Sequence, residues 1–513
     1  MMVLKSSLEA EARSEKSNSL RRKYAPKTRE MTLTPQTQNY HLSVHKEKFE
    51  LISMDREPHV LVIPFPAQGH AGPLMKLSTK IAEHGIKVTF VSTEHMHAKI
   101  TASMPQKAEQ SSLITMVSIP DGLESHEADR RDLQKVRQSM LTVMPVCLRN
   151  LIEKVNKSND CEQISCVIAD LTVGWAFEVA EQMGIARAAV IPYAPASLAL
   201  VLHAPNLVEA GLLDSNGNAM TDEPILLSEG TLPWKKKEYG WCFPSQPHMQ
   251  KLFFGACSAV AQNLKISNWI LCNSFYELDP PACDLIPNIL TIGPLLGRDH
   301  LEHSAVNFWP EDSTCLGWLD KQAVGSVIYV AFGSVAVLSQ EQLEELALGL
   351  ESLQQPFLWV VRPDFMNKSH AKLPDGFVER VSDRGKLVEW APQEKVLGHP
   401  SVACFLSHCG WNSTLEGLSM GVPFLCWPYF ADQYQNRNYI FDAWKIGLRF
   451  FPDENGIITR QEIQRQVKAL LNDGGIKANA LKMKQMARKS LVEGGSSFRN
   501  FESFVSQLKA IGC

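Results

Sequence analysis

Residues 390–433 read WAPQEKVLGHPSVACFLSHCGWNSTLEGLSMGVPFLCWPYFADQ, and their pattern predicts two strand–turn–helix units in succession. The apolar run 402–408 is typical of a buried strand, and a tight turn over 409–413 follows it. We expect a helix over 414–420, ended by Gly421, and a further strand over 423–428. This alternation predicts an α/β fold, with helices packed on a parallel sheet.

Polar and aromatic side chains follow the ends of these strands. Ligands of open parallel sheets bind beyond the carboxyl ends of the strands, where loops meet the N-termini of helices. Trp390 offers a flat face for a base, and the turn amides of 410–413 suit a diphosphate. His408 adds a hydrogen-bond donor, while Asp432 and Gln433 suit sugar hydroxyls. These residue types together suit the parts of a nucleotide-sugar.

The segment 390–433 resembles the signature box of the plant-type family 1 UDP-glycosyltransferases along its whole length. The shared positions are the WAPQ start, the HCGWNS core, the GVP turn and the ADQ end. A box of this length is highly specific, unlike a lone glycine triplet. The resemblance implies the GT-B fold, in which two Rossmann-like domains with parallel sheets face each other across a cleft. It also implies an enzyme that moves a sugar from a UDP-sugar to a small hydrophobic acceptor.

For the nucleoside, the resemblance implies that Trp390 stacks on uracil, that Gln393 meets the base or ribose, and that Glu416 accepts the ribose hydroxyls. Ser334, in the turn after the predicted strand SVIYVAFGS, would donate to a phosphate or to the base. Structural alternatives stay open for two of these positions. Ser413-x-x-Glu416 is also the pattern of a helix capping box, and Ser334 could cap a helix.

For the rest of the donor, the resemblance implies a diphosphate site made by His408, Asn412 and Ser413. The hexose would be held by Trp411, Asp432 and Gln433. A final Gln in this box is associated with glucose donors and a His with galactose, so Gln433 favours UDP-glucose. A solvent-facing Gln near a helix start would give the same pattern. The remaining donor-binding positions are Ala391, Pro392 and Gly410.

The start of the globular chain carries the predicted base. A near-continuous apolar strand over 59–66 is followed by the turn 67–73 and by an amphipathic helix over 74–85. His70 therefore lies at the carboxyl end of a strand, although an isolated His there is more often a polar turn residue. In the resembled family the histidine of this turn is the general base, a role that suits its near-neutral pKa.

Asp170 ends a second predicted strand, 164–170. The resemblance implies that Asp170 accepts a hydrogen bond from the far ring nitrogen of His70, which would fix the tautomer and stabilise the imidazolium. Helix N-capping is the structural alternative, and both roles can hold together.

The implied reaction is a direct displacement at the anomeric carbon with inversion. His70 would deprotonate the acceptor oxygen, which attacks from the face opposite UDP. Helix-end amides and His408 would stabilise the departing diphosphate in place of a metal, and the chain has no Asp-x-Asp to chelate one. We therefore expect neither a metal nor a cofactor, because the UDP-sugar is a co-substrate.

Composition excludes several other classes. The length of 513 residues suggests two or three domains, and the net charge of -4 gives no field that draws the chain to nucleic acid or to an anionic membrane. No apolar run approaches the roughly 18 residues that span a bilayer, and no signal peptide is visible. The 12 cysteines include no CxxC pair, which favours buried free thiols in a reducing cytoplasm. We expect a cytoplasmic monomer.

The predicted organisation has five parts. Residues 1–53 are polar without periodicity and are predicted to be disordered. The acceptor-binding domain is expected over 54–296, an interdomain linker over 297–313 and the UDP-sugar-binding domain over 314–492. By resemblance to GT-B proteins, a final helix over 493–513 crosses back to the first domain. Residues 214–262 lack a regular pattern and are expected to shape the acceptor pocket.

Two alternative functions stay open, and a third fails. The same fold could use UDP-galactose, UDP-xylose or UDP-rhamnose as the donor. A non-catalytic binder of UDP-sugars or small hydrophobic molecules would keep the fold, but the presence of both His70 and Asp170 argues against it. An NAD-dependent oxidoreductase would explain the alternating pattern, but the first βαβ unit lacks GxGxxG. Phenolic, flavonoid and terpenoid acceptors all suit an apolar pocket.

Overall fold

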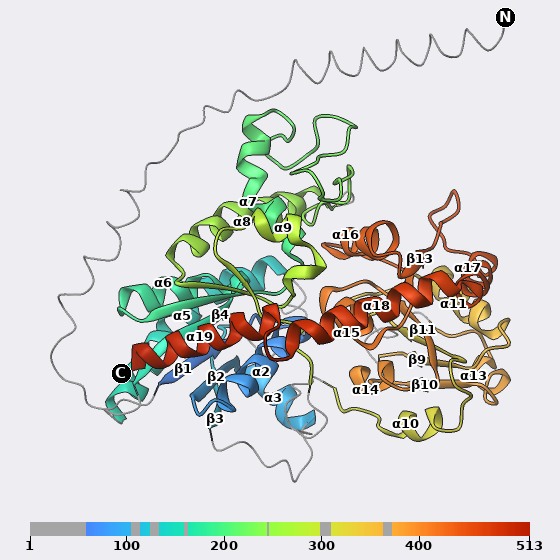
Figure 1. Cartoon of the computed structure of the whole chain (residues 1–513), viewed down its shortest axis with the longest axis horizontal. Helices are drawn as coiled ribbons and strands as arrows, with labels where there is room; N and C mark the ends of the chain where they lie inside the picture. The colour runs from blue at the N-terminus through green and yellow to red at the C-terminus, as the bar shows by residue number, and fades with distance from the viewer. Residues whose placement is uncertain are drawn as a thin grey trace, which may run out of the picture. The chain divides into compact units, whose positions relative to one another are not determined.

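The computed structural model describes residues 58–103, 113–123, 133–158, 163–243, 246–297, 309–362 and 372–512. The predicted disordered extension 1–53 and most of the predicted linker 297–313 lie outside the described residues. Over the described residues, the chain forms two separate parallel sheets, each flanked by helices (Figure 1). The predicted α/β class is confirmed.

The first sheet defines an N-lobe, residues 58–297. Its seven strands lie in the order β3-β2-β1-β4-β5-β6-β7. β1 is buried along its whole length, as expected for a parallel strand covered on both faces. The strands are β1 His59–Ile63, β2 Lys87–Thr93, β3 Ile114–Ile119, β4 Ile164–Asp170, β5 Ala186–Ile191, β6 Trp269–Cys272 and β7 Ile289–Thr291. The helices are α2 Gln68–Ala82, α3 Glu94–Ser103, α5 Leu133–Ser158, α6 Trp175–Gln182, α7 Pro195–Glu209, α8 Pro247–Ile266 and α9 Pro280–Asp284.

The second sheet defines a C-lobe, residues 309–491. Its six strands lie in the order β10-β9-β8-β11-β12-β13. They are β8 Val327–Ala331, β9 Phe357–Val360, β10 Gly385–Val388, β11 Val402–Ser407, β12 Phe424–Cys426 and β13 Gly447–Arg449. The helices are α10 Thr314–Leu319, α11 Gln340–Glu351, α13 Phe377–Arg380, α14 Gln393–Leu397, α15 Trp411–Met420, α16 Gln433–Asn438, α17 Arg460–Asn472 and α18 Gly474–Leu491.

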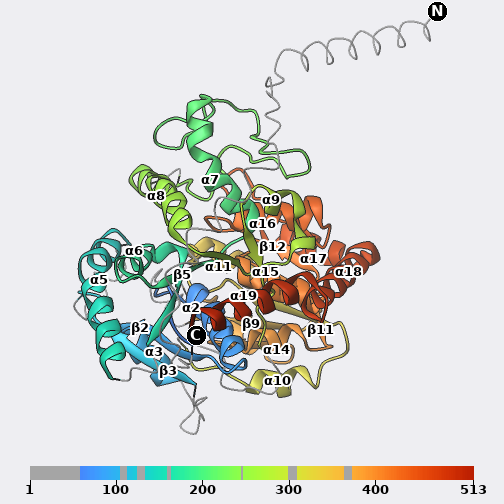
Figure 2. The ribbon, with the colours of Figure 1, turned by 60° about the vertical axis from the view of Figure 1, so that its left-hand side comes forward.

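The end of the chain joins the two lobes. α18 packs on α15 of the C-lobe, whereas the next helix, α19 (Ser496–Gly512), packs against β4 and β7 of the N-lobe (Figures 1 and 2). Phe501, Phe504 and Leu508 of α19 belong to the same hydrophobic core as the first-sheet strands. Burying each of these side chains contributes about 1.5–3 kcal/mol, so α19 is a firm attachment to the N-lobe.

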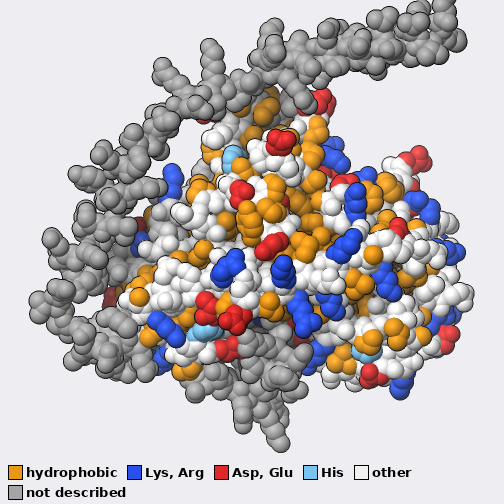
Figure 3. All heavy atoms as spheres, in the orientation of Figure 1, with side chains coloured by type: hydrophobic (Ala, Val, Ile, Leu, Met, Phe, Trp, Pro, Cys, Tyr) orange, Lys and Arg blue, Asp and Glu red, His pale blue; other side chains and the backbone are white. Residues whose placement is uncertain are grey.

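α18 is a basic helix, and Figure 3 shows Lys and Arg side chains gathered over this part of the surface. Its lysines are exposed, while Met483 and Met486 pack inward against the core. Among the described helices, none combines the length and the apolarity that a bilayer span requires. The 10 described cysteines are all free thiols.

One expectation for the N-lobe was wrong. The sequence pattern predicts irregular structure over 214–262, but α8 begins at Pro247 and runs beyond this segment. Met249, Phe253 and Cys257 recur at helical spacing and pack inward, while Gly255 interrupts the run of helix-forming residues between them. Tertiary packing against α7 overrides that weak propensity.

Candidate active site

A cavity of about 820 Å³ opens between the lobes, at the carboxyl ends of β1, β8 and β11. His70 lies on the N-lobe wall. Asp170 lies behind His70 and is fully buried. The structure places all of the predicted donor-binding positions on the lining of this one cavity: Ser334, Trp390, Ala391, Pro392, Gln393, His408, Gly410, Trp411, Asn412, Ser413, Glu416, Asp432 and Gln433.

The ring of His70 is held by a buried carboxylate. His70 Nδ1 lies 2.7 Å from Asp170 Oδ2, and the other Asp170 oxygen accepts from the amide and the hydroxyl of Thr172, at 2.8 and 2.6 Å. Asp170 therefore caps the following 3-10 turn and also binds His70, so both alternatives from the sequence hold. Nε2 is the ring nitrogen that this pairing leaves for the cavity.

His70 is not in a turn before the helix, as the sequence pattern suggests. α2 already begins at Gln68, so His70 lies in its first turn and Pro73 lies inside the helix. Pro73 has no N–H, so the carbonyl oxygen of Gly69, four residues earlier, lacks its intrahelical donor, and Asn412 Nδ2 donates to it instead at 2.6 Å. The sequence pattern misplaces the helix start because Gly69, Gly72 and Pro73 resemble a turn.

Carboxylates from both lobes act on His70. Burial by itself would lower the pKa of His70, but the charge and hydrogen bond of Asp170, with a smaller effect of Asp432, outweigh it and raise the pKa above 6.5. Burial in turn raises the pKa of Asp432 to about 6. This arrangement stabilises an imidazolium, the form that His70 takes after it accepts a proton.

The N-terminus of α15 points into the cavity. α15 begins at Trp411 with Gly410 as its N-cap, so Ser413 is inside the helix and the capping-box alternative for Glu416 is wrong. The first amides of a helix have no intrahelical acceptor, and no acidic side chain occupies the first turn of α15. The site therefore presents unpaired donors and the positive end of a helix, which suit a diphosphate.

His408 lies beside this helix end in a space made by two glycines. A Cβ atom at Gly410 would lie 2.4 Å from His408 Nε2, and one at Gly333 would lie 2.6 Å from it. Burial, with a contribution from Arg362, lowers the pKa of His408 to about 4. His408 is therefore neutral near pH 7 and can serve as a hydrogen-bond donor but not as a cation.

Arg362 organises the turn after β8, a role that the sequence does not reveal. Its guanidinium donates to the carbonyl oxygens of Ser334 and Ala336, each at 2.8 Å. This turn is not a helix start, because α11 begins at Gln340 with Ser339 as its N-cap. The helix-cap alternative for Ser334 is therefore wrong.

Trp390 is supported from behind by a second indole. Trp309, in the predicted linker, stacks on Trp390 with ring centroids 4.7 Å apart and planes 29° apart. Arg362 lies over Trp309, 5.8 Å from its ring centre. Trp390 lines the cavity but Trp309 does not, so the open face of Trp390 is the one available to a base. A single Trp in a polar segment gave no sign of this contact.

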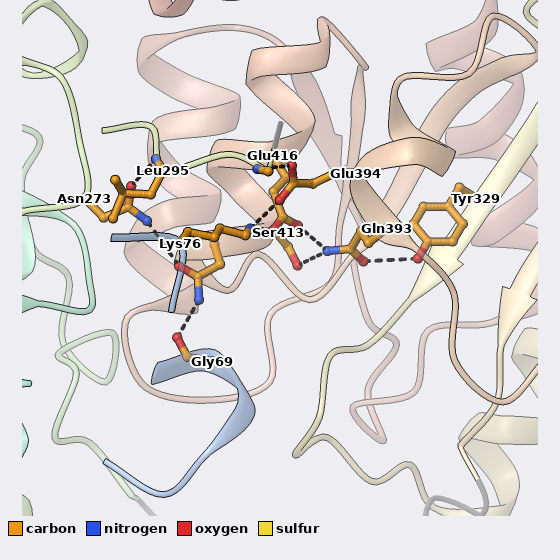
Figure 4. A network of polar contacts seen from close by, with 11 residues as sticks. Gly69, Lys76, Asn273, Leu295, Tyr329, Gln393, Glu394, Ser413 and Glu416 are labelled. Atoms are coloured by element: carbon orange, nitrogen blue, oxygen red, sulfur yellow. Dashed lines mark hydrogen bonds and ion pairs between the residues drawn. The ribbon is translucent and has the colours of Figure 1, made fainter. Parts of the chain in front are cut away.

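A polar network surrounds Glu416 (Figure 4). Gln393 Nε2 donates to Glu416 Oε2 at 2.7 Å and to Ser413 Oγ at 2.8 Å, while its carbonyl accepts from the Tyr329 hydroxyl at 3.1 Å. Lys76 of α2 reaches across the cavity and contacts Glu416 Oε1 at 3.2 Å. Sequence reasoning missed Lys76 and Tyr329, because a lysine on an amphipathic helix and a tyrosine in a buried strand are ordinary features.

Two residues predicted to bind the donor use their side chains to join the lobes. Trp411 Nε1 donates to the carbonyl oxygen of Asn273 at 2.7 Å, and Asn412 Nδ2 donates to that of Gly69 at 2.6 Å. These donors are therefore engaged with the N-lobe rather than open to the cavity. The backbone amides of Trp411 and Asn412 are still the first amides of α15.

Asp432 and Gln433 lie at the start of α16. Asp432 Oδ2 accepts from Asn436 Nδ2 at 2.9 Å. Gln433 Oε1 accepts from the amides of Tyr429 and Phe430, at 2.7 and 3.0 Å. Gln433 is only 5% exposed, so the alternative of a solvent-facing Gln is wrong. Its carbonyl shapes the loop, and its amide nitrogen is the part left for a ligand.

A metal site was not expected, and the described residues offer no grouping of three or more His, Cys, Asp or Glu side chains that could hold a metal ion.

Comparisons with known proteins agree with this geometry. The family model described as UDP-glucoronosyl and UDP-glucosyl transferase matches residues 256–493, and the model for a glycosyltransferase N-terminal domain matches residues 57–119. UDP-glycosyltransferase 83A1 of Arabidopsis thaliana is 42% identical over 461 residues, which cover 88% of this chain and 97% of that protein. Linamarin synthase 1 of Manihot esculenta is 33% identical, over 89% of this chain and 98% of that protein.

Solved structures match over the same length. Os79 from O. sativa in complex with UDP superposes with a TM-score of 0.74 at 27% identity, over 88% of this chain and 100% of that one. UGT2 of Phytolacca americana, complexed with UDP-2fluoro-glucose and pterostilbene, superposes with a TM-score of 0.72 at 28% identity. The match covers 88% of this chain and 99% of that one. The predicted GT-B architecture and the family resemblance are both confirmed. The chain belongs to the plant family 1 UDP-glycosyltransferases and is a transferase of the GT-B fold.

Proposed function

We propose that this enzyme transfers glucose from UDP-glucose to a hydroxyl or carboxyl oxygen of a small hydrophobic acceptor, with inversion at the anomeric carbon. One observation carries the proposal. The His70–Asp170 pair stands on one wall of a cavity whose opposite wall carries every donor-binding position. A base and an activated sugar can therefore meet in one enclosed space.

The donor would bind along the C-lobe wall. Uracil would stack on the open face of Trp390, and the ribose hydroxyls would bond Glu416. The diphosphate would lie at the first amides of α15, with neutral His408 as a further donor. Asp432 and the free amide nitrogen of Gln433 would then hold the hexose near His70.

The chemistry follows from the two ring nitrogens of His70. Asp170 holds the proton of Nδ1, so Nε2 is the acceptor for the proton of the attacking hydroxyl. The acceptor oxygen bonds the anomeric carbon as the bond from that carbon to the β-phosphate oxygen breaks. General-base catalysis of this kind contributes about 10²–10⁴-fold. The α15 amides and His408 would stabilise the negative charge that grows on UDP.

The acceptor would occupy the cavity beside His70, whose lining includes apolar side chains. Pro192 and Phe430 line the cavity, and the ring of Phe65 lies 5.2 Å from that of His70. Similar proteins carry the names linamarin synthase and mogroside I-E synthase, and a solved neighbour holds pterostilbene. These names support a plant secondary metabolite with an apolar body and one reactive oxygen.

The test is an acceptor screen that measures UDP release with UDP-glucose. Phenolic, flavonoid and terpenoid acceptors should be compared, each with UDP-galactose, UDP-xylose and UDP-rhamnose in parallel. We expect the highest kcat/KM with UDP-glucose and no UDP release without an acceptor. A higher kcat/KM with another sugar would refute the glucose assignment, and no turnover in the whole matrix would favour the non-catalytic binder.

We also propose that the enzyme acts in the cytoplasm. All 10 described cysteines are free thiols, and most of them are buried. Free thiols suit a reducing compartment.

Removing divalent metal should leave turnover unchanged. The proposed leaving-group stabilisation comes from the α15 amides and from His408, which need no ion. UDP release by enzyme purified in EDTA should equal that of the untreated enzyme, with added Mg²⁺ as the comparison. Loss of activity in EDTA that Mg²⁺ restores would contradict this account of the leaving group.

Gln433→Ala should raise the KM for UDP-glucose by about 2- to 10-fold, because one buried hydrogen bond contributes about 0.5–1.5 kcal/mol. It should also lower the ratio of kcat/KM for UDP-glucose to kcat/KM for UDP-galactose. The matched control is Gln464→Ala on α17, whose amide bonds Ser352 outside the cavity. If KM and donor preference are both unchanged, Gln433 does not bind the sugar.

A further inference from the structure

Lys76 is a cationic side chain of the N-lobe that faces two carboxylates on the donor-binding wall of the C-lobe. It lies on α2, six residues after His70, and its side chain is only 14% exposed. Its ammonium forms ion pairs with Glu394 at the start of α14 and with Glu416 on α15 (Figure 4). The helix that carries the base is thereby attached to the carboxylate expected to bind ribose.

This ion pair is compatible with a bound donor. A carboxylate has about four lone-pair positions on its two oxygens. At Glu416, Lys76 uses one position on Oε1, and Gln393 uses one on Oε2. One position on each oxygen is left for the two neighbouring hydroxyls of a ribose. Lys76 can therefore stay in place while the donor binds, and it also balances the charge of the buried carboxylate.

Glu394 extends the attachment to the end of the N-lobe. Its Oε1 pairs with Lys76, while its Oε2 accepts from the amide of Gly297 at 2.7 Å. Gly297 is the first residue of the predicted linker and the last described residue before position 309. Glu394 therefore contacts the N-lobe at two points that lie far apart in the sequence.

Pro73 allows a second attachment, near the N-terminus of α2. A proline has no N–H, so the carbonyl of Gly69, four residues earlier, receives no intrahelical bond from it. That carbonyl accepts from Asn412 Nδ2 at 2.6 Å instead. α2 is thus held to α15 on both sides of Pro73, by Gly69 near His70 and by Lys76 about two turns further on.

We propose that Lys76 is a positioning residue for sugar transfer, which holds the helix bearing His70 in register with the donor. The proposal rests on the proposed function, in which His70 is the base. The groups that face Lys76 are Glu394 on α14 and Glu416 on α15, with the Tyr329 hydroxyl behind Gln393. The two carboxylates keep Lys76 charged, because together they raise its pKa although burial opposes this.

The experiment compares Lys76→Met, Lys76→Arg and Lys80→Met. Met keeps the length of Lys76 without its charge, and Arg keeps a charge able to bridge two carboxylates. Lys80 lies one turn later on the same helix, over the ring of Phe501 in α19 rather than in the cavity. It controls for the loss of a lysine from α2.

Lys76→Met should lower kcat about 10- to 100-fold, because a displacement of about 1 Å of a catalytic group can cost 10²-fold. The Kd for UDP should change by no more than about threefold, because Trp390, Gln393 and the α15 amides are retained. A threefold change in Kd corresponds to less than about 1 kcal/mol of binding free energy. Lys76→Arg should restore most of kcat, and Lys80→Met should match the wild type.

Hydrogen exchange of the α2 amides gives a readout that is independent of turnover. It should rise in Lys76→Met and stay unchanged in Lys80→Met. The proposal would be overturned if Lys76→Met kept the kcat of the wild type or lost only UDP affinity. It would also be overturned if Lys76→Met and Lys80→Met lost kcat equally. If another UDP-sugar proves to be the donor, the comparison is made with that sugar. An inactive wild type would refute the proposed function, while the exchange data would still decide the role of Lys76.

Discussion

His70→Ala is expected to lower kcat by about 10²–10⁴-fold, the contribution of a general base. The variant removes the ring nitrogen that faces the cavity but leaves the C-lobe wall intact, so the Kd for UDP should stay close to that of the wild type. Turnover is measured as UDP release, and UDP affinity by calorimetry. His84→Ala is the matched control, because His84 also pairs with a carboxylate, Glu502 at 3.0 Å, but lies outside the cavity.

The pH profile gives the same variant a second readout. A general base must be unprotonated, so kcat/KM should rise with pH through the pKa of His70, which Asp170 and Asp432 raise above 6.5 despite burial. The rising limb should therefore lie above pH 6.5 in the wild type and be lost in His70→Ala. Equal losses of kcat and UDP affinity would mean that His70 is structural.

Asp170→Asn should be about as damaging, with a fall in kcat of about 10²–10⁴-fold, because it disables the same general base, as when the carboxylate of a serine-protease triad is changed to an amide. Its oxygen can still accept from Thr172, so the cap of the 3-10 turn is retained. The new NH₂ group would face Nδ1 of His70 and require that nitrogen to accept. The ring proton would then sit on Nε2, which could no longer take a proton from the acceptor.

The control for Asp170→Asn is Asp473→Asn. Asp473 caps α18 through its carboxylate and lies outside the cavity. It should leave kcat unchanged, while both variants should melt close to the wild type. An Asp170→Asn enzyme with kcat within about threefold of the wild type, a difference of less than 1 kcal/mol in barrier, would exclude this role for Asp170.

Apolar runs such as 59–66 and 402–408 predicted buried strands of a parallel sheet, and the family resemblance implied that there are two such sheets. The signature box 390–433 located the donor wall because its residues are close in sequence, and strand–turn–helix geometry alone brings their strand ends together. Boundaries were less predictable. α2 starts before its apolar periodicity does, and α15 starts at Trp411, so its first turn includes residues that resemble a loop.

The contacts that sequence could not reveal are those between segments far apart in the chain. Lys76 meets Glu416 across 340 positions, and Asn412 meets Gly69 across 343. Trp309 stacks on Trp390 from a polar segment with no periodicity of its own. No local pattern encodes such pairs, because each partner alone is an ordinary helix or loop residue. These pairs nevertheless decide how the two walls of the cavity are held together.

The most direct test is a crystal structure of the full chain with UDP bound. The uracil should stack on the face of Trp390 opposite Trp309, and the ribose hydroxyls should lie within hydrogen-bond distance of Glu416. The β-phosphate should lie at the first amides of α15, on the side of the cavity that faces His70. UDP bound elsewhere, or bound with its β-phosphate turned away from His70, would contradict a transfer reaction across this cavity.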